Sequence, residues 1–245
     1  YILTYSIVSR RYALTYTLKK ARMRLIAHRG FLSVNPENTV AAVEAAAAVA
    51  DGIEIDVRRC GSGEPVVVHD ETVDRVTDGH GAVGEHTVAD LAALDVLETG
   101  AGVPTLEAVL RAVPDHVGVN VELKEAGMEA DVLRLIDAIH PHGIVSSFYR
   151  DALRDCREID PGVPRAYITK EADRDSVEVA EELGCEFLHP WIENCTDRTV
   201  SAAHRAGMSV TAWAAETPEQ ARTAADLGAD GVIANSPDVL EEGPH

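Results

Sequence analysis

Two histidines each follow a short apolar run that is typical of a buried β-strand. Leu25-Ile-Ala leads into His28, Arg29 and a glycine, and Pro65-Val-Val-Val leads into His69. Imidazole is the side chain whose ordinary pKa lies nearest neutrality, so a pair of histidines suits acid–base catalysis. A single histidine at a strand end is usually a hydrogen-bonded structural residue. Whether His28 and His69 are catalytic therefore depends on which other residues lie near them.

Three carboxylates fall in two other apolar runs. Side chains alternate between the faces of a strand, so Glu54 and Asp56 share one face of the run Gly52–Val57, and Glu122 shares a face with Lys124. Carboxylates that converge in a protein interior repel one another unless a cation or protons compensate. Hard oxygen ligands favour Mg²⁺ or Ca²⁺ over zinc. The sequence therefore predicts one divalent cation at this cluster.

Together these side chains predict phosphoryl chemistry. The cation would polarise a phosphoryl oxygen, and Arg29 and Lys124 would hold the remaining negative charge. One of the two residues His28 and His69 would take the proton of an attacking hydroxyl, and the other would protonate the leaving oxygen. Each short segment alone arises often by chance. Four of them, each at the end of a predicted strand, favour an active site.

Alternating strands and helices must position these residues. From Arg24 onward, short β-branched runs alternate with Ala-, Leu- and Glu-rich segments, which is typical of parallel strands joined by right-handed crossovers. The predicted strands are Arg24–Ala27, Gly52–Val57, Pro65–His69, Gly118–Leu123, Gly143–Ser147, Arg165–Ile168, Glu186–His189, Ser209–Trp213 and Gly231–Ala234. The predicted helices include Asn38–Ala50, Ala130–His140, Arg174–Leu183, Asp197–Ala206 and Pro218–Leu227.

The fold that we predict is an α/β fold, a (β/α)8 TIM barrel, and the nine predicted strands are one more than its eight. About seven residues separate Gly52–Val57 from Pro65–His69, whereas a parallel crossover needs roughly a dozen or more. We therefore predict an antiparallel hairpin centred near Ser62, with His69 roughly opposite Asp56, as an excursion from the barrel. A doubly wound open sheet is the alternative architecture.

The predicted domain organisation is a single barrel domain, residues 23–245, with two additions. Residues 71–104 interrupt the alternation with glycine-containing loops and one predicted helix at Thr87–Leu94. An insertion after the His69 strand is expected to lie over the barrel mouth, where such barrels carry their active sites. Residues 1–22 are expected to be a flexible N-terminal arm or a mis-set translation start, with Met23 as the first residue of the domain.

The charge balance is strongly acidic. Asp and Glu total 41 against 22 Lys and Arg, and since residues 1–22 hold five basic residues and no acidic ones, the remainder carries 17 − 41 = −24. Such a surface repels nucleic acid and anionic membranes. It is typical of halophilic proteins, in which salt screens the self-repulsion. An ordinary acidic cytosolic protein is the alternative interpretation.

Cysteine usage and hydropathy indicate a cytoplasmic protein. The four cysteines, Cys60, Cys156, Cys185 and Cys195, are too sparse for a disulfide framework or a zinc site, so we expect reduced and mostly buried thiols. The sequence contains no apolar run near the roughly 20 residues that span a bilayer, and we expect no membrane anchor. The oligomeric state is not predicted.

The motifs of the chain, taken in order, resemble those of the glycerophosphodiester phosphodiesterase family. They are His28-Arg29-Gly30, Pro36-Glu37-Asn38-Thr39, Glu54-Ile55-Asp56-Val57, Val66-Val-Val-His69-Asp70, Arg75-Val-Thr77-Asp-Gly79-His-Gly81, Glu122-Leu-Lys124, Ser146-Ser147-Phe148, Trp213, and Gly231-Val-Ile-Ala-Asn-Ser-Pro237. The resemblance covers about Arg24 to Leu240. It lies in the combination and order of the motifs, since any one of them alone is unspecific.

The resemblance implies hydrolysis of small-molecule glycerophosphodiesters to glycerol phosphate and an alcohol, within lipid and glycerol metabolism. His28 and His69 would be the acid–base pair, and attack by the neighbouring glycerol hydroxyl would pass through a cyclic phosphate. Glu54, Asp56 and Glu122 would bind one divalent cation, Ca²⁺ or Mg²⁺.

The resemblance also implies the substrate contacts. Arg29 and Lys124 would contact the phosphate, and Phe148 and Trp213 would line the pocket on the glycerol side. Phe31, Glu216 and Asn235 depart from the family pattern, in which a small residue, Asn and Asp respectively are common. None of the three belongs to the predicted acid–base or metal set, so we expect them to affect the choice of substrate rather than the chemistry.

Two other functions fit the same pattern. A lipid-directed phosphodiesterase, of the lysophospholipase D or phospholipase C type, would keep the barrel and change the substrate, but no amphipathic membrane-binding face is evident. A non-catalytic phosphodiester-binding module would keep the pocket without turnover. The complete set of histidines, carboxylates and lysine argues against such a module.

Overall fold

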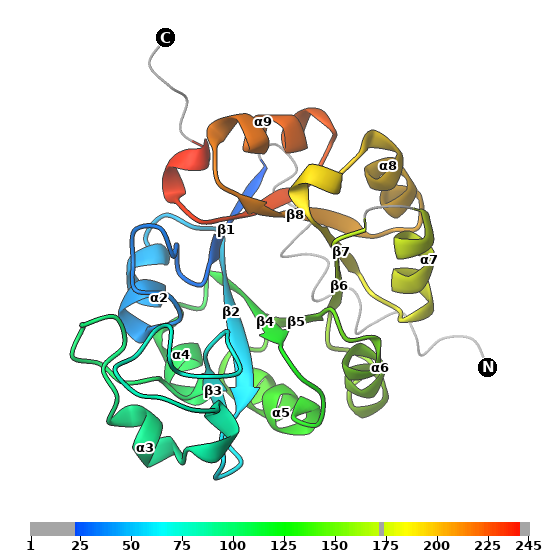
Figure 1. The fold of residues 1–245 in the computed structure, drawn as a ribbon. Helices are drawn as coiled ribbons and strands as arrows, with labels where there is room; N and C mark the ends of the chain where they lie inside the picture. The colour runs from blue at the N-terminus through cyan, green and yellow to red at the C-terminus, as the bar shows by residue number, and fades with distance from the viewer. Residues whose placement is uncertain (1–22, 172–173, 241–245) are drawn as a thin grey trace.

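The computed structural model describes residues 23–171 and 174–240, and its strands close into a barrel with the helices outside (Figure 1). The barrel strands are β1 (Arg24–His28), β2 (Gly52–Arg59), β4 (Gly118–Leu123), β5 (Ile144–Ser147), β6 (Arg165–Thr169), β7 (Phe187–Pro190), β8 (Ser209–Ala215) and β9 (Gly231–Ala234). All pairings among them are parallel, and β1 pairs with both β9 and β2, which closes the ring. The predicted (β/α)8 barrel is confirmed, and the open sheet is excluded.

The helices that follow the strands cover the outside of the ring. They are α2 (Val40–Ala46), α4 (Leu106–Ala112), α5 (Glu129–Ile139), α6 (Arg150–Ile159), α7 (Arg174–Glu182), α8 (Asp197–Arg205) and α9 (Pro218–Asp226), with short 3₁₀ turns at Val83–Glu85, Ile192–Asn194 and Pro237–Leu240. Threonine side chains accept a hydrogen bond from the first turn of α2, α4, α8 and α9, which satisfies an otherwise unpaired backbone N–H group. These local caps fix where each crossover helix begins.

Helix α2 begins later and ends earlier than the predicted range Asn38–Ala50. Thr39 is the N-cap of the helix, and Asn38 before it adopts a φ of +59°, outside the helical region. Asparagine is among the few residues that tolerate this conformation. The departure from helical geometry at Asn38 turns its side chain toward β2, where its Nδ2 donates to Asp56 Oδ2 at 2.9 Å.

The ninth strand, β3 (Pro65–Val67), lies outside the ring and pairs antiparallel with β2. The predicted hairpin is therefore confirmed, with a small change of register. Val57 faces Val67, and the Val68 N–H donates to the Asp56 carbonyl at 3.0 Å. A turn centred on Ser62 thus places Val68 opposite Asp56, and His69 follows one residue later in the loop.

Residues 71–104 form a small layer against this hairpin, with the short helix α3 (Val88–Ala92) shorter than predicted. The layer has its own apolar cluster, which includes Cys60, Val66, Val73 and Leu91. A larger cluster fills the space between the barrel strands and the outer helices. Segment 71–104 therefore packs as an extension of the β2–β3 hairpin, with Arg75 reaching back toward residue 70.

All four cysteines are free and buried, as predicted, and none of the helices in the described ranges is long and apolar enough to cross a membrane. The expected N-terminal arm, residues 1–22, lies outside the described residues.

Candidate active site

A pocket of about 290 Å³ opens at the carboxyl ends of the barrel strands. This is the end of a (β/α)8 barrel at which active sites are found, and the volume approaches that of a small-molecule site. The pocket contains eight of the nine predicted site residues, and Asp56 lies completely buried beneath it. Its lining residues are His28, Arg29, Glu54, His69, Asn120, Glu122, Lys124, Phe148, Ile168, Lys170, Trp213 and Ile233.

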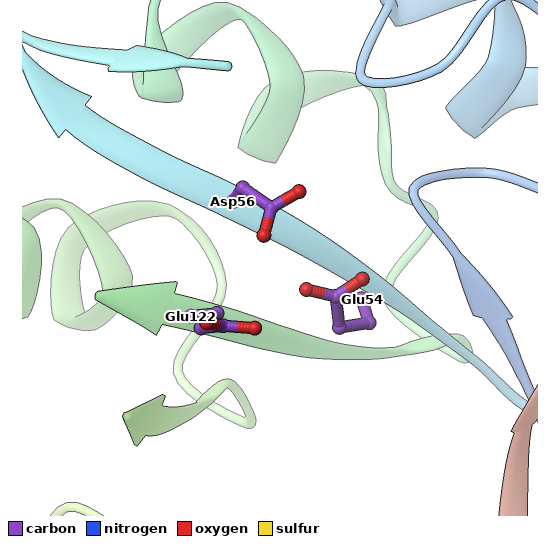
Figure 2. A group of neighbouring side chains, drawn as sticks. All are labelled: Glu54, Asp56 and Glu122. Carbon is purple, nitrogen blue, oxygen red and sulfur yellow. The ribbon is translucent and has the colours of Figure 1, made fainter. Parts of the chain in front are cut away.

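The three predicted carboxylates meet at one side of this pocket. Glu54 and Asp56 extend from β2 and Glu122 from β4 into the same space (Figure 2). One oxygen from each lies within 4.8 Å of the others, and all three residues are buried. The parallel register pairs Asp56 with Glu122. The two carboxylates that share a face of β2, as predicted, therefore lie beside the carboxylate of β4.

Two cations, Arg29 and Lys124, lie next to the carboxylates. Arg29 Nε lies 3.0 Å from Asp56 Oδ2 in an ion pair whose angle does not make it a hydrogen bond. Lys124 Nζ lies 2.7 Å from Glu122 Oε1 and 3.4 Å from Asp56 Oδ1. Three carboxylates thus face two cations, and the cluster has an excess of one negative charge. A buried excess charge requires either a proton or a bound cation.

The pKa values of the three carboxylates show which of them carry the uncompensated negative charge. Burial, followed by repulsion from Asp56, raises the pKa of Glu122 to about 7 and that of Glu54 well above its usual range. Burial would also raise the pKa of Asp56, but the positive charges of Arg29 and Lys124 outweigh it and hold that pKa at about 2. Asp56 therefore stays ionised, and Glu54 and Glu122 share the uncompensated charge.

The carboxylate geometry fits a divalent cation. Glu54 Oε1 and Asp56 Oδ1 are buried and have no hydrogen-bond partner among the described residues, which leaves lone pairs on both carboxylates available to a ligand. Glu54, Asp56 and Glu122 together offer hard oxygen ligands on one side of an open pocket. Such a donor set suits Mg²⁺ or Ca²⁺, which keep water or substrate oxygens in their remaining positions. These residues could therefore hold a metal ion.

The His28 side chain contacts Asn235, which directly follows β9. Its Nδ1 lies 2.6 Å from Asn235 Oδ1, and its Nε2 lies 3.9 Å from Glu54 Oε2. An amide oxygen only accepts, so Nδ1 carries the hydrogen and Nε2 keeps its lone pair. Burial and the neighbouring Arg29 lower the pKa of His28 to about 4.

This contact corrects one expectation. Asn235 was expected to leave the acid–base set untouched, yet its side chain bonds directly to His28. The two residues are separated by 207 positions in the chain and meet because β1 and β9 are neighbours in the closed ring. Nothing local to either residue in the sequence indicates this contact.

His69 sits in a different electrostatic environment. Its Nδ1 lies 2.6 Å from Asp70 Oδ1, and Arg75 Nε donates to Asp70 Oδ2 at 2.5 Å. Arg75 also forms two hydrogen bonds of 2.8 Å with Glu37. Burial lowers the pKa of His69, while the charge of Asp56 and the bond to Asp70 act in the opposite direction. A carboxylate partner favours the imidazolium form more than an amide partner does.

Four further residues of the sequence motifs support the site, although the motifs alone predict no role for them. They are Glu37, Asn38, Asp70 and Arg75. Glu37 accepts from both Arg29 and Arg75, at 3.0 and 2.8 Å, and so joins the two histidine environments. In the sequence, only the residue types indicate such a supporting role, since Glu, Asn, Asp and Arg in turn-rich segments often form directed hydrogen bonds.

The wall on the other side of the pocket is aromatic. The rings of Phe148 and Trp213 meet edge to face, with centroids 5.4 Å apart and an interplanar angle of 85°. Trp213 Nε1 donates to the His189 carbonyl at 2.8 Å, which satisfies the indole N–H. Both residues line the pocket.

A sequence profile of the glycerophosphoryl diester phosphodiesterase family matches residues 28–239. The chain belongs to this family. It is 31% identical over 231 residues to a glycerophosphodiester phosphodiesterase of Caldanaerobacter subterraneus subsp. tengcongensis, covering 88% of this chain and 95% of that protein. It is also 31% identical over 233 residues to a glycerophosphodiester phosphodiesterase of Bacillus altitudinis, with the same two coverages, 88% and 95%.

Solved structures agree with this assignment. A phosphodiesterase of Oleispira antarctica, solved in complex with the product sn-glycerol-3-phosphate, superposes with a TM-score of 0.81 at 29% identity, covering 87% of this chain and 93% of that one. A glycerophosphodiester phosphodiesterase of Thermotoga maritima gives a TM-score of 0.75 at 26% identity, covering 89% and 97%. The protein is an enzyme, a phosphoric diester hydrolase of this family.

Proposed function

We propose that the protein hydrolyses glycerophosphodiesters to glycerol phosphate and an alcohol, with a divalent cation bound at Glu54, Asp56 and Glu122. The observation that carries the proposal is the buried cluster of three carboxylates with one uncompensated charge, next to two histidines in one pocket. When bound, the cation would neutralise that charge and polarise a phosphoryl oxygen. Family membership and the product named in the Oleispira antarctica complex support the substrate class.

The residues of the chain divide the remaining work. Arg29 and Lys124 lie at the carboxylate cluster and line the pocket, so they would neutralise the other phosphate oxygens as negative charge develops. Phe148 and Trp213 would pack against the glycerol carbons, since an apolar edge-to-face pair offers carbon contacts rather than charge.

The two histidines would transfer the proton in opposite directions. Neutral His28, with its lone pair on Nε2, would accept the proton of the attacking glycerol hydroxyl as its oxygen bonds to phosphorus. His69, supported by Asp70, would give a proton to the alcohol oxygen as the bond from phosphorus to that oxygen breaks. Hydrolysis of the resulting cyclic phosphate would use the same pair with the roles exchanged, which restores both protonation states.

Two single substitutions test the assignment. His28→Ala and His69→Ala are each expected to lower kcat for glycerophosphocholine by about 10²-fold or more, which is the usual contribution of general acid–base catalysis. His142→Ala is a matched control, because His142 is an exposed histidine outside the pocket. Circular dichroism should show that all three variants remain folded. Full activity in either His28→Ala or His69→Ala would overturn the acid–base assignment.

Metal dependence is tested separately. EDTA is expected to abolish turnover, and added Ca²⁺ or Mg²⁺ should restore it. Asp56→Asn should not be rescued, because it removes the carboxylate that keeps its charge at neutral pH. Rates that are indifferent to EDTA and to added cations would contradict the metal proposal. Comparing glycerophosphodiesters with lysolipids on the same enzyme distinguishes the proposed function from a lipid-directed phosphodiesterase.

A further inference from the structure

The two histidines of the pocket are supported by the backbone in different ways. His28 is the last residue of β1, a strand of the ring that pairs with a neighbour on each side. His69 lies two residues beyond the end of β3, in the loop that leads into segment 71–104. A catalytic side chain on a loop is placed less precisely than one on a strand unless other residues hold it. The contacts of His69 therefore decide how well its ring is oriented.

The main chain at His69 is held by a buried arginine of β2. Arg58 Nε donates to the His69 carbonyl at 2.8 Å, and Arg58 Nη1 donates to Glu125 Oε2 at 3.2 Å. Arg58 is buried. This contact fixes the position of the His69 backbone, but it leaves the rotation of the imidazole ring to other residues.

The imidazole ring is held by Asp70. Asp70 Oδ1 lies 2.6 Å from His69 Nδ1. Burial would raise the pKa of Asp70, but hydrogen bonds from Arg75 and His69 outweigh it and hold that pKa at about 2. Because an ionised carboxylate only accepts hydrogen bonds, Nδ1 carries its hydrogen toward Asp70, and Nε2 is the nitrogen that remains for a substrate.

Arg75 connects Asp70 to the body of the barrel. Arg75 Nε donates to Asp70 Oδ2 at 2.5 Å, and Nη1 and Nη2 each donate to Glu37 at 2.8 Å. Glu37 lies just before α2, is 9% exposed, and also accepts from Arg29 at 3.0 Å. A planar guanidinium that uses all three of its nitrogens on two carboxylates is held in one orientation. Arg75 therefore fixes Asp70, a half-buried loop residue, against a buried carboxylate.

Accepting the proposed function, we propose that Arg75 is a positioning residue for proton delivery to the leaving alcohol. It holds Asp70 against Nδ1 and so directs the Nε2–H bond of His69 at the alcohol oxygen. In this step the glycerol hydroxyl oxygen bonds to phosphorus and gives its proton to His28. The bond from phosphorus to the alcohol oxygen breaks, and that oxygen takes the Nε2 proton of His69. Arg75 does not line the pocket, so it acts through His69.

The test compares two diesters that differ in their leaving group. The alcohol oxygen of glycerophosphocholine needs a proton as its bond to phosphorus breaks, whereas glycerol 4-nitrophenyl phosphate releases a phenolate that is stable at neutral pH. Arg75→Ala is expected to lower kcat for glycerophosphocholine about 10- to 100-fold, because a misplacement of about 1 Å can cost about 10²-fold, and to change KM little. It should leave kcat for the nitrophenyl diester near the wild-type value. Equal losses on both diesters would overturn the proposal, and so would no loss on either.

A double variant separates action through His69 from a general effect on the pocket. In His69→Ala there is no imidazole to orient, so adding Arg75→Ala should cause no further loss of kcat for glycerophosphocholine. Losses that multiply in the double variant would show that Arg75 acts by another route and would overturn the proposal. Arg111→Ala is the matched control, because Arg111 is an exposed arginine that pairs with Glu107 at 2.7 Å on α4; both rates should stay unchanged.

Failure of the proposed function would show differently. If the wild-type enzyme turned over neither diester, the hydrolase proposal would fail, while NMR of the histidine rings would still test Arg75. In Arg75→Ala the ¹⁵N chemical shifts of the His69 ring should move toward those of a free histidine. Those of His28, whose Nδ1 contacts Asn235, should stay unchanged and show that the barrel remains folded. Unchanged shifts of the His69 ring would overturn the positioning role.

Discussion

The charge of each buried carboxylate depends on which cations lie beside it. Asp56 lies near both Arg29 and Lys124 and keeps its charge, whereas the pKa values of Glu54 and Glu122 rise. The same difference separates the histidines, because His28 has an amide as its partner and His69 has a carboxylate. Chemically similar residues in one pocket thus acquire different protonation behaviour from single contacts.

Metal binding is expected to release protons. Glu122 has a pKa of about 7 without a metal, and a carboxylic acid must lose its proton before it can bind a cation. Affinity for Ca²⁺ or Mg²⁺ should therefore weaken as the pH falls from 8 to 6, by about tenfold per pH unit below 7 for each displaced proton. Calorimetry in two buffers of different ionisation enthalpy measures the number of protons released.

A carboxylate outside the cluster provides the control for this titration. Glu125 pairs with Arg58, and Glu125→Gln should preserve both the affinity and its pH dependence. Metal binding with the same affinity at pH 6 and pH 8 in the wild type would contradict the charge distribution described above.

The partner of His28 is expected to set the acid limb of the pH–rate profile. Asn235→Asp would place a carboxylate 2.6 Å from Nδ1, and an opposite charge stabilises the imidazolium and raises the pKa of His28. The acid limb of kcat/KM should then move upward by about one pH unit or more. Asn235→Ala should lower kcat without an upward shift. An unchanged acid limb in Asn235→Asp would show that His28 does not act as the base.

At the scale of elements, short loops between strands and helices depend on close backbone approach. Gly30 links the end of β1 to the segment before α2 with a φ of +77°, and a Cβ at this position would lie 2.8 Å from Ala42 Cβ and 2.9 Å from the Ala42 carbonyl carbon. The histidine end of β1 and the helix α2 thus approach as closely as the backbone permits. Only glycine satisfies both the conformation and the contact.

Gly30→Ala is therefore expected to be more destabilising than an ordinary glycine substitution at positive φ. The loss should be about 3 kcal/mol, from left-handed strain of about 1 kcal/mol together with overpacking. Gly207→Ala is the matched control, because Gly207 has a φ of +84° and no atom within 4 Å of its added Cβ; it should lose about 1 kcal/mol. Urea unfolding of both variants measures the difference, and equal losses would contradict the close packing of α2.

At the scale of the whole molecule, the acidic surface dominates long-range electrostatics. The pocket gathers Arg29, Lys124 and Lys170 within a chain of formal charge −19. These three cations balance the charges of Glu54, Asp56 and Glu122, so the mouth is less negative than the remaining surface, which repels polyanions. The halophilic interpretation remains a prediction that follows from charge alone.

Salt is expected to stabilise the protein by screening its self-repulsion. Raising NaCl from 0.1 to 2 M at pH 7 should increase Tm by several degrees, because the Debye length falls from about 10 Å to below 3 Å. The same titration near pH 4.8, the isoelectric point, serves as the control and should show a much smaller increase. A Tm that does not rise with salt at pH 7 would indicate an ordinary acidic protein.

The sequence predicted the barrel, the hairpin and nine residues that the fold gathers at one pocket. It could do so because strand period and strand ends are local properties: Glu54 and Asp56 must share a face once their run is a strand, and a loop of seven residues is too short for a parallel crossover. The helix ends were less accurate, since caps such as Thr39 and the positive φ of Asn38 depend on contacts with β2.

Which distant residues meet depends on how the barrel closes. Asn235 reaches His28 because β9 closes the ring against β1, and Lys170 faces Arg29 across the mouth because β6 is opposite β1. Glu37 accepts hydrogen bonds from both Arg29, next to His28, and Arg75, which binds the Asp70 partner of His69. These contacts depend on strand adjacency and ring closure, and the local pattern of side chains along a single chain contains neither.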